Sequence, residues 1–261
     1  MICIEGKTAF SGIAIGPIRE FAKKSSAVRR SHVDDTAAEC TRFEEAKKVA
    51  MEELGALYDK AVKEVGEDNA AIFEVHQMML DDEDYCDSIR NIITTQEVNA
   101  EFAVATTGDN FAAMFAGMDD EYMKARSADV KDISERLISI LNGDDTDASL
   151  NDEPAIIVAD DLAPSETVQM DKDKVLSFVT VHGSLNSHTA ILARTMAIPA
   201  LVGTPLPLDE SVDGKLGIVD GSDGTIYVDP DEETLAAMQK RRTEDEEKKK
   251  LLLTLKGKAV S

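Results

Sequence analysis

The chain has 261 residues, of which 43% are hydrophobic, so it is long enough for one large domain or two modest ones with a packed core. Its 51 acidic and 28 basic residues give a net charge of −23, which argues against nucleic acid as a partner and favours a partner with a positive surface. No apolar run reaches the roughly 20 residues that a membrane span needs, the first ten residues do not resemble a signal peptide, and the scattered cysteines Cys3, Cys40 and Cys86 indicate reduced thiols in the cytoplasm.

The first half of the chain changes from strand-like to helical sequence. Residues 2–18, ICIEGKTAFSGIAIGPI, alternate in hydrophobicity and contain turn glycines, which predicts two short strands. From about Asp34 to Gly143, apolar residues recur at three- and four-residue steps without a proline, which predicts a bundle of helices that stops at Asn142 and Gly143. The first predicted helix face consists of Phe43, Ala46, Ala50, Leu54, Leu57, Ala61 and Val65, and the last of Val130, Ile133, Leu137 and Ile140.

The second half alternates between short strands and helices. Residues 163–170, APSETVQM, have a proline and a serine directly after the first residue, which favours a helix start. The segment 229–257 has acids early and bases late, which predicts a charged surface or linker helix. The expected strands are residues 155–159, 175–181, 199–203, 216–221 and 224–228. We therefore expect an α+β (α/β-type) protein in which both chain ends build one β/α domain and the helical bundle is inserted into its first loop.

The stretch HGSLNSHTAILART, residues 182–195, places His188 at the start of a short helix packed on the sheet. Asn186 or Ser187 is the expected N-cap. In a first turn the helix dipole disfavours the imidazolium, so the ring stays neutral and nucleophilic, and the N–H groups attract an anion carried by the ring. A phosphoryl-accepting histidine needs both properties. The alternative from position alone is a histidine that caps the helix or packs against it.

Arg194 and the other three histidines are not expected to take part in phosphoryl transfer directly. Arg194 falls well round the helix from His188, which predicts a helix-end charge or a surface salt bridge rather than a phosphate ligand. His76 is mid-helix, His182 ends a strand and His32 lies in a polar stretch, so none of the three is expected to act as nucleophile.

The segment GSLNSHTAILAR, residues 183–194, resembles the phosphohistidine signature of the PEP-utilising enzymes, roughly Gly-Gly-x-Thr-Ser-His-Thr-Ala-Ile-x-Ala-Arg. Three positions depart from it: Ser184 replaces a glycine, Leu185 stands where a basic residue is frequent, and Asn186 replaces a threonine but keeps an N-cap acceptor. The resemblance implies that His188 is the phosphohistidine nucleophile. The supporting motif residues are Gly183, Asn186, Ser187, Thr189 and Arg194.

Three further segments resemble the Enzyme I family, the phosphoenolpyruvate–protein phosphotransferases of the bacterial sugar phosphotransferase system. LAPSETVQM (162–170) is similar to its Pro-Ser-Glu-Thr segment, and the resemblance implies that Thr167 orients the His188 ring by a hydrogen bond. The alternative is a threonine that bonds its own helix backbone. GEDNAAIFEVHQMMLDDEDY (66–85) and DDEYMKARSADVKDISERL (119–137) resemble the helical subdomain that docks HPr, a small histidine-containing phosphocarrier. The similarity covers about residues 1–250.

The docking surface implied by this resemblance is acidic and rich in methionine. Carboxylates steer a basic partner, and methionines adapt to an irregular one. The alternative is that the methionines belong to the core and the charges to a solvated face. The residues placed at or near HPr by family position are Glu67, Asp68, Glu74, His76, Met78, Met79, Asp82, Glu83, Asp84 and Arg126.

The resemblance also implies a domain organisation. Residues 1–32 and 146–232 would form a swivelling phosphohistidine domain, 33–145 the HPr-binding bundle, and 233–261 a linker helix toward a PEP-binding barrel that this chain lacks. PEP and magnesium bind that barrel in the family, so we expect no cofactor or metal in this chain. We expect it to be a monomer that exchanges phosphoryl groups with HPr but does not use PEP efficiently, whereas the full-length family protein is dimeric.

Two other functions remain open from the sequence. One is the phosphohistidine domain of a dikinase such as pyruvate phosphate dikinase or PEP synthase, which shares the histidine motif but lacks the helical insert. The other is a non-catalytic interaction module in which the bundle binds a partner and His188 is structural. A paralogue that serves a nitrogen-linked or dihydroxyacetone-linked relay is a variant of the favoured function.

Overall fold

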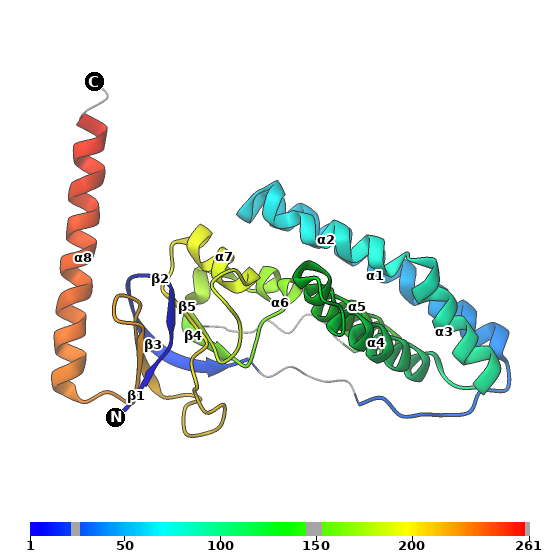
Figure 1. Ribbon diagram of the computed structural model, residues 1–261. Helices are drawn as coiled ribbons and strands as arrows, with labels where there is room; N and C mark the ends of the chain where they lie inside the picture. The colour runs from blue at the N-terminus through cyan, green and yellow to red at the C-terminus, as the bar shows by residue number, and fades with distance from the viewer. Residues whose placement is uncertain (22–26, 145–152, 259–261) are drawn as a thin grey trace. The chain divides into compact units, whose positions relative to one another are not determined.

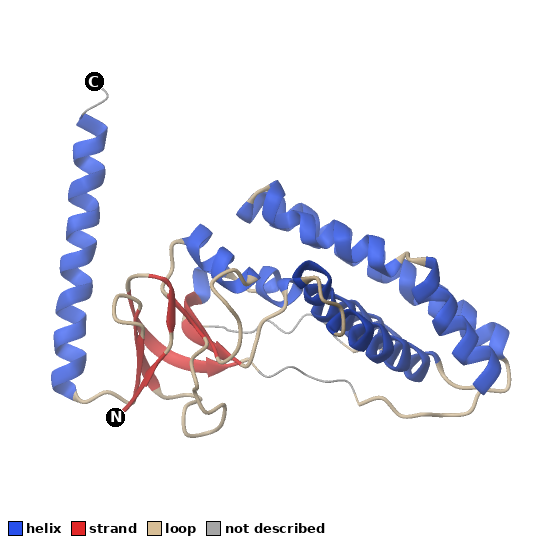
Figure 2. Cartoon of the chain, viewed as in Figure 1, coloured by secondary structure: helices blue, strands red, loops and turns tan. Residues whose placement is uncertain are grey.

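The computed structural model describes residues 1–21, 27–144 and 153–258, and the chain divides into two compact units. The sheet unit contains Met1–Ala22 and Ser149–Ser261, and the helical unit contains Lys23–Ala148. Figures 1 and 2 show strands in the first unit and helices throughout the second. This combination confirms the expected fold class, whereas the predicted domain boundaries stay a prediction.

The sheet unit is built on eight strands in the order β1-β8-β7-β3-β4-β5-β6-β2. Pairing is parallel from β3 through β4 and β5 to β6, and antiparallel elsewhere. Side chains of these strands form the core, which includes Ile18, Ile156, Val179, Leu201 and Val219. The strands are β1 Ile2–Glu5, β2 Lys7–Phe10, β3 Ile13–Glu20, β4 Ala155–Ala159, β5 Val175–Thr180, β6 Ala200–Val202, β7 Leu216–Asp220 and β8 Thr225–Val228.

The N-terminal segment forms three strands, so the prediction of two was wrong. Gly6 interrupts the first run, and its N–H donates to the carbonyl of Gly224 at 2.8 Å. As a result β1 pairs with β8 while β2 pairs with β6, at opposite ends of the strand order. Because β1 and β2 follow one another directly in the chain, the sheet must curl until its two ends approach each other.

Three α-helices belong to the sheet unit: α6 Pro164–Gln169, α7 His188–Met196 and α8 Glu232–Lys258, with a short 3₁₀ turn at Lys172–Lys174. The expected helices at 163–170 and in the C-terminal segment are therefore present. Helix α8 is tied to the sheet by Arg241, whose Nη1 lies 2.8 Å from the fully buried carboxylate of Asp220 at the end of β7. Met238 on the same helix is also buried.

The helical unit consists of α1 Thr36–Val65, α2 Glu67–Leu80, α3 Glu83–Gln96, α4 Ala100–Ala116 and α5 Glu121–Asn142. All seven residues of the predicted α1 face are buried. On α5 the stripe holds for Val130, Ile133 and Leu137, but Ile140 is half-buried and Ile138 takes its place in the core. Gly143 ends α5 in the left-handed conformation at φ +69, as expected of a C-terminal glycine. The bundle is inserted between β3 and β4 rather than into the first loop, because three strands precede it.

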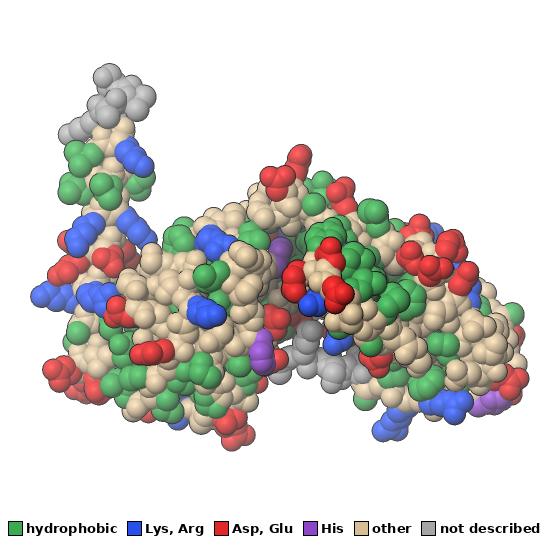
Figure 3. All heavy atoms as spheres, viewed as in Figure 1, with side chains coloured by type: hydrophobic (Ala, Val, Ile, Leu, Met, Phe, Trp, Pro, Cys, Tyr) green, Lys and Arg blue, Asp and Glu red, His purple; other side chains and the backbone are tan. Residues whose placement is uncertain are grey.

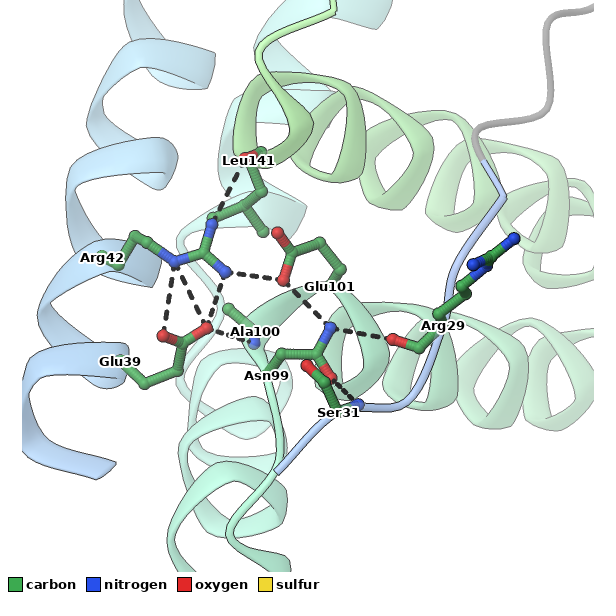
Figure 4. Close-up of polar contacts among 8 residues, drawn as sticks. All are labelled: Arg29, Ser31, Glu39, Arg42, Asn99, Ala100, Glu101 and Leu141. Atoms are coloured by element: carbon green, nitrogen blue, oxygen red, sulfur yellow. Dashed lines mark hydrogen bonds and ion pairs between the residues drawn. The ribbon is translucent and has the colours of Figure 1, made fainter. Parts of the chain in front are cut away.

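The beginnings of α1 and α4 and the end of α5 meet at one partly buried ion-pair cluster, which Figure 4 shows. The guanidinium of Arg42 on α1 lies 2.6 Å from the carboxylates of both Glu39 and Glu101 and donates to the carbonyl of Leu141 at 3.2 Å. Hydrogen bonds from this guanidinium to the two carboxylates raise the pKa of Arg42. The amide of Asn99, before α4, bonds the backbone of the chain segment that leads into the unit, through Ser31 N–H at 2.9 Å and the Arg29 carbonyl at 3.0 Å.

Replacing Gly108 by alanine is expected to lower the free energy of unfolding of the helical unit by about 2 kcal/mol, as overpacking of a dense core does. A Cβ at this position of α4 would stand 2.5 Å from Oγ and 2.8 Å from Cβ of Ser134 on α5. Ser134 is buried and hydrogen-bonded to the Tyr85 hydroxyl at 2.7 Å, so it has little freedom to move. Urea unfolding followed by circular dichroism measures the change.

The matched control for this prediction is Gly55→Ala on α1. A Cβ there meets only the Gln77 side-chain nitrogen, at an ordinary 3.5 Å. Alanine should therefore stabilise this helix by about 0.5–1 kcal/mol through its higher helix propensity. Equal effects of the two substitutions would contradict the close approach of α4 and α5.

Candidate functional site

The predicted nucleophile lies at one edge of the sheet unit, where two parallel strands end. Strands β4 and β5 are neighbours in parallel register, with Ala159 opposite Thr180. Each runs into a loop and then a helix: β4 leads to α6, which carries Thr167, and β5 leads to α7, which begins with His188. Helices α6 and α7 pack against each other. The carboxyl ends of parallel strands are where α/β folds build their sites, so the placement agrees with a functional role.

His188 is the first residue of α7 and is half-buried. Ser187 is the N-cap: its Oγ accepts the N–H of Ala190 at 3.3 Å, so the expected cap at 186 or 187 is at Ser187. The adjacent first-turn position of His188 is therefore confirmed. At this end of the helix the positive pole of the dipole favours a neutral ring and a bound anion.

The loop from 183 to 187 is held at both ends. Gly183 has φ +108, which a residue with a Cβ adopts only under strain, and this turn directs the chain from β5 toward α7. The N–H of Ser187 donates to the Ser184 carbonyl at 3.0 Å, and the Asn186 N–H donates to Ser184 Oγ at 3.3 Å. The serine that replaces a glycine of the family motif is thus accommodated as an acceptor within the turn.

Arg194 lies in the last turn of α7, so the predicted helix-end charge is confirmed. The other predicted possibility, a surface salt bridge, is not found within the described part of the chain. Nη2 of Arg194 donates instead to the carbonyl of Leu185 at 2.8 Å, nine residues back. The guanidinium thus ties the end of α7 to the loop that precedes it.

Thr167 is buried on α6, with 1% of its surface exposed. Its hydroxyl donates to the carbonyl of Pro164 at 2.9 Å, which is the local backbone bond considered as the alternative. A hydroxyl oxygen that donates one bond still has lone pairs to accept an N–H from a ring. The orienting role of Thr167 toward His188 therefore stays a prediction.

A second imidazole lies beside the same loop. Nδ1 of His182 is 2.9 Å from Oδ1 of Asp160, and the His182 N–H donates to the Asp160 carbonyl at 2.8 Å. These bonds continue the β4–β5 pairing beyond the strands. Both side chains are 70% exposed, so the ion pair adds little stability and mainly fixes the point where the loop begins.

The helical unit has a separate candidate surface, a cavity of about 430 Å³ lined by residues of α2, α3, α4 and α5. Five of the predicted docking residues lie in its wall: Met78, Met79, Asp82, Asp84 and Arg126. Met78 is 73% exposed, which a core methionine would not be. In Figure 3, hydrophobic and acidic side chains lie side by side on the helical unit. An adaptable apolar surface with an acidic rim is typical of a docking site for a basic partner.

The other predicted docking residues lie outside the lining of this cavity. Glu67, Asp68, Glu74 and Glu83 are exposed on α2 and α3. His76 was expected at or near the partner surface, but it is 0% exposed, so it does not lie at the surface itself: its ring points inward toward α5, where it pairs with Asp129.

The sequence did not predict the other seven residues of the cavity wall, which are Val75, Tyr85, Phe111, Met114, Phe115, Tyr122 and Val130. Met114 is 49% exposed and Tyr122 66% exposed. A signal was present, because FAAMFAGMDDEYM (111–123) ends an apolar helix with more large apolar side chains than one buried face can hold.

Two classes of site receive no support in the described residues. No group of three or more histidine, cysteine or acidic side chains there is arranged to hold a metal ion. Among the helices that the structure describes, none combines the length and hydropathy of a membrane span.

Comparison with known proteins gives consistent matches over most of the chain. The family model for the N-terminal part of PEP-utilising enzymes matches residues 5–126, and the model for their mobile domain matches residues 151–224. A phosphoenolpyruvate-protein phosphotransferase of Bacillus sp. (strain S) is 42% identical over 89% of this chain and 40% of its own length. The protein of the same name from Bacillus subtilis (strain 168) is 39% identical over 89% of this chain and 41% of its own length. The chain thus spans about two fifths of these relatives.

Two solved structures share the fold. An NMR solution structure of Enzyme I is 34% identical, with a TM-score of 0.76 over 93% of this chain and 99% of that one. The N-terminal domain of a nitrogen Enzyme 1 is 26% identical, with a TM-score of 0.61 over 92% of this chain and 99% of that one.

Proposed function

The chain belongs to the family of PEP-utilising enzymes that includes the phosphoenolpyruvate-protein phosphotransferases, and on that premise we propose that it is a phosphoryl relay whose nucleophile is His188. The observation that carries the proposal is the position of His188 at the start of α7, behind a loop fixed by Gly183 and Arg194. A neutral ring nitrogen attacks phosphorus, the new N–P bond forms as the bond to the donor breaks, and the phosphoryl group stays on the ring.

The partner in this relay is HPr. The phosphoryl group passes in-line between the HPr histidine and His188, in either direction, with one N–P bond formed for each one broken. The cavity with Met78, Met79 and Arg126 in its wall, and the exposed carboxylates of α2 and α3, have the apolar and acidic character that a basic phosphocarrier requires. Thr167 would accept an N–H from the His188 ring and so leave the other nitrogen to react.

PEP and Mg²⁺ would act in the part of the longer relatives that this chain does not span, where the phosphoryl group is first taken from PEP. Isolated, the chain should be a monomer that equilibrates phosphoryl groups with HPr and uses PEP poorly. The reduced state expected of its cysteines agrees with a place in the cytoplasm.

The intact mass of the chain after mixing with phosphorylated HPr tests the proposal. The expected result is one added phosphoryl group, lost on brief acid treatment, as a phosphoramidate is, and transferable to fresh HPr. HPr binding without transfer would instead support the interaction module. Absence of both would overturn the Enzyme I relay and favour the dikinase-type domain.

A further inference from the structure

His76 occupies a closed site inside the helical unit with a carboxylate on each side of its ring. Its side chain is 0% exposed. Nε2 lies 3.0 Å from Oδ1 of Asp129, and Nδ1 lies 3.5 Å from Oδ2 of Asp132, a distance that is long for a hydrogen bond but within reach of an ion pair. Both aspartates are on α5, and their side chains are only 12% and 13% exposed. The ring edge of Phe73 closes another side, with 6.2 Å between ring centroids.

One hydrogen bond fixes the direction of this ring. An ionised carboxylate only accepts, so Nε2 donates to Oδ1 of Asp129 at 3.0 Å. Nδ1 faces Asp132 at 3.5 Å without a hydrogen bond to it. The contact of the ring with α5 is therefore made through Asp129.

Asp129 connects this ring to the docking cavity. Its second oxygen, Oδ2, lies 3.2 Å from Nη1 of Arg126. The Arg126 guanidinium lies over the ring of Tyr122 at 4.4 Å from its centroid and also donates to the Tyr122 hydroxyl. Arg126 and Tyr122 both line the cavity, and Arg126 is the one cation among the described residues of its wall. The contacts thus run from the buried ring through Asp129 to the surface.

We propose that His76 is a positioning residue that, through Asp129, aims Arg126 at an acceptor oxygen of HPr. Asp129 accepts from the ring with one oxygen and holds the guanidinium with the other, so the ring fixes the orientation of the carboxylate that holds Arg126. Without the ring N–H, the carboxylate can turn about its own bonds, and Arg126 loses its fixed direction toward the partner. The acceptor on HPr would be a backbone carbonyl or a carboxylate, since guanidinium offers donors only. This inference rests on the proposed docking of HPr.

The ring contact can be measured directly. In the ¹⁵N-labelled chain, two-bond ¹H–¹⁵N correlation spectra should show a proton on Nε2 of His76, the nitrogen that faces Asp129, with the assignment given by the loss of the signals in His76→Phe. A ring whose only proton is on Nδ1 would overturn the proposal. This readout does not depend on HPr, so it remains decisive if the chain fails to bind HPr, an outcome that would overturn the proposed function instead.

The positioning role is tested by binding. His76→Phe keeps the ring shape but removes the N–H that bonds Asp129. It should raise the Kd for HPr by about tenfold, the range of a lost anchor contact, while the rate of phosphoryl transfer at saturating HPr stays unchanged. His32→Phe is the matched control, because His32 is exposed in the same unit and pairs with the exposed Asp34. An unchanged Kd in His76→Phe would overturn the proposal.

A second variant separates positioning from misfolding. Asp129→Asn keeps the size of the side chain but removes the charge between His76 and Arg126, and it should weaken HPr binding to a similar extent. Because the two residues act in one chain of contacts, the double variant should bind little worse than either single variant. Independent effects that multiply in Kd would overturn the coupling, and unchanged amide spectra confirm that each variant is folded.

Discussion

Replacing His188 by alanine is expected to abolish phosphoryl uptake from phosphorylated HPr, a loss of at least about 10⁴-fold, because alanine offers no nucleophile and the relay has no other route to the product. Binding of HPr should persist with unchanged Kd, since the docking cavity is built from α2, α3, α4 and α5 and includes no residue of the sheet unit. Intact mass measures uptake, and calorimetry measures binding.

The control for this result is His32→Ala, which removes an exposed histidine outside both the loop and the cavity. It should take up one phosphoryl group, as the unaltered chain does. An acid-labile phosphoryl group on the His188→Ala variant would contradict the assignment of the nucleophile. Loss of HPr binding in that variant would show instead that the loop before α7 takes part in docking.

Replacing Arg42 by methionine is expected to lower the free energy of unfolding of the helical unit by about 1–2 kcal/mol at pH 7, less than for a fully buried pair because the Arg42 side chain is 39% exposed. The variant keeps the apolar stem but leaves the carboxylates of Glu39 and Glu101 without their shared cation, and it leaves the Leu141 carbonyl without a donor (Figure 4). The matched control is Lys124→Met, which removes an exposed pair with Glu121 and should cost less than about 0.5 kcal/mol.

This effect should depend on pH with a definite sign. Burial alone would raise the pKa of Glu101, but hydrogen bonds from Arg42, the backbone and Asn99 outweigh it and lower that pKa in the folded chain. The unfolded chain therefore takes up the proton first as the pH falls. The contribution of the ion pair is complete above the ordinary glutamate range, near pH 4.3, and is lost as the pH falls through the folded value. Urea unfolding at several pH values between 7 and 3 should show the gap between variant and unaltered chain narrowing. A constant gap would contradict the prediction.

The sequence predicted helices and strands well where the pattern of apolar residues was clear. Seven apolar residues of α1 recur over about six helical turns, and all of them are buried, since one stripe of a helix must face the core. The strand β4 was found to the residue because its five consecutive apolar side chains are covered on both faces. The start of α7 was found because Ser187 and His188 follow a turn and precede an apolar face.

What the sequence did not reveal depends on contacts between distant residues. The sequence predicted two strands in residues 2–18, but it did not show that β1 and β2 pair with β8 and β6, some two hundred residues away. The position of His76 in the sequence is compatible with the buried face and with the exposed face of α2. Its pairing with Asp129 on α5 is what shows that the ring points inward. The prediction for Arg194 used its angle around the helix from His188. That angle does not reveal the hydrogen bond from Arg194 to the carbonyl of Leu185 in the preceding loop.

The place of the helical insertion has a consequence for how the chain folds. Strands β3 and β4 pair in parallel, with Ile18 opposite Ile156, yet the whole segment 21–154 separates them. The helices in that segment contact one another over short sequence separations, so they can assemble early and shorten the loop that the sheet must close. Refolding from urea should therefore show helical signal before the β3–β4 ladder is protected from hydrogen exchange. The edge of the sheet formed by β4 and β5, where His188 lies, would therefore be completed after the helical unit.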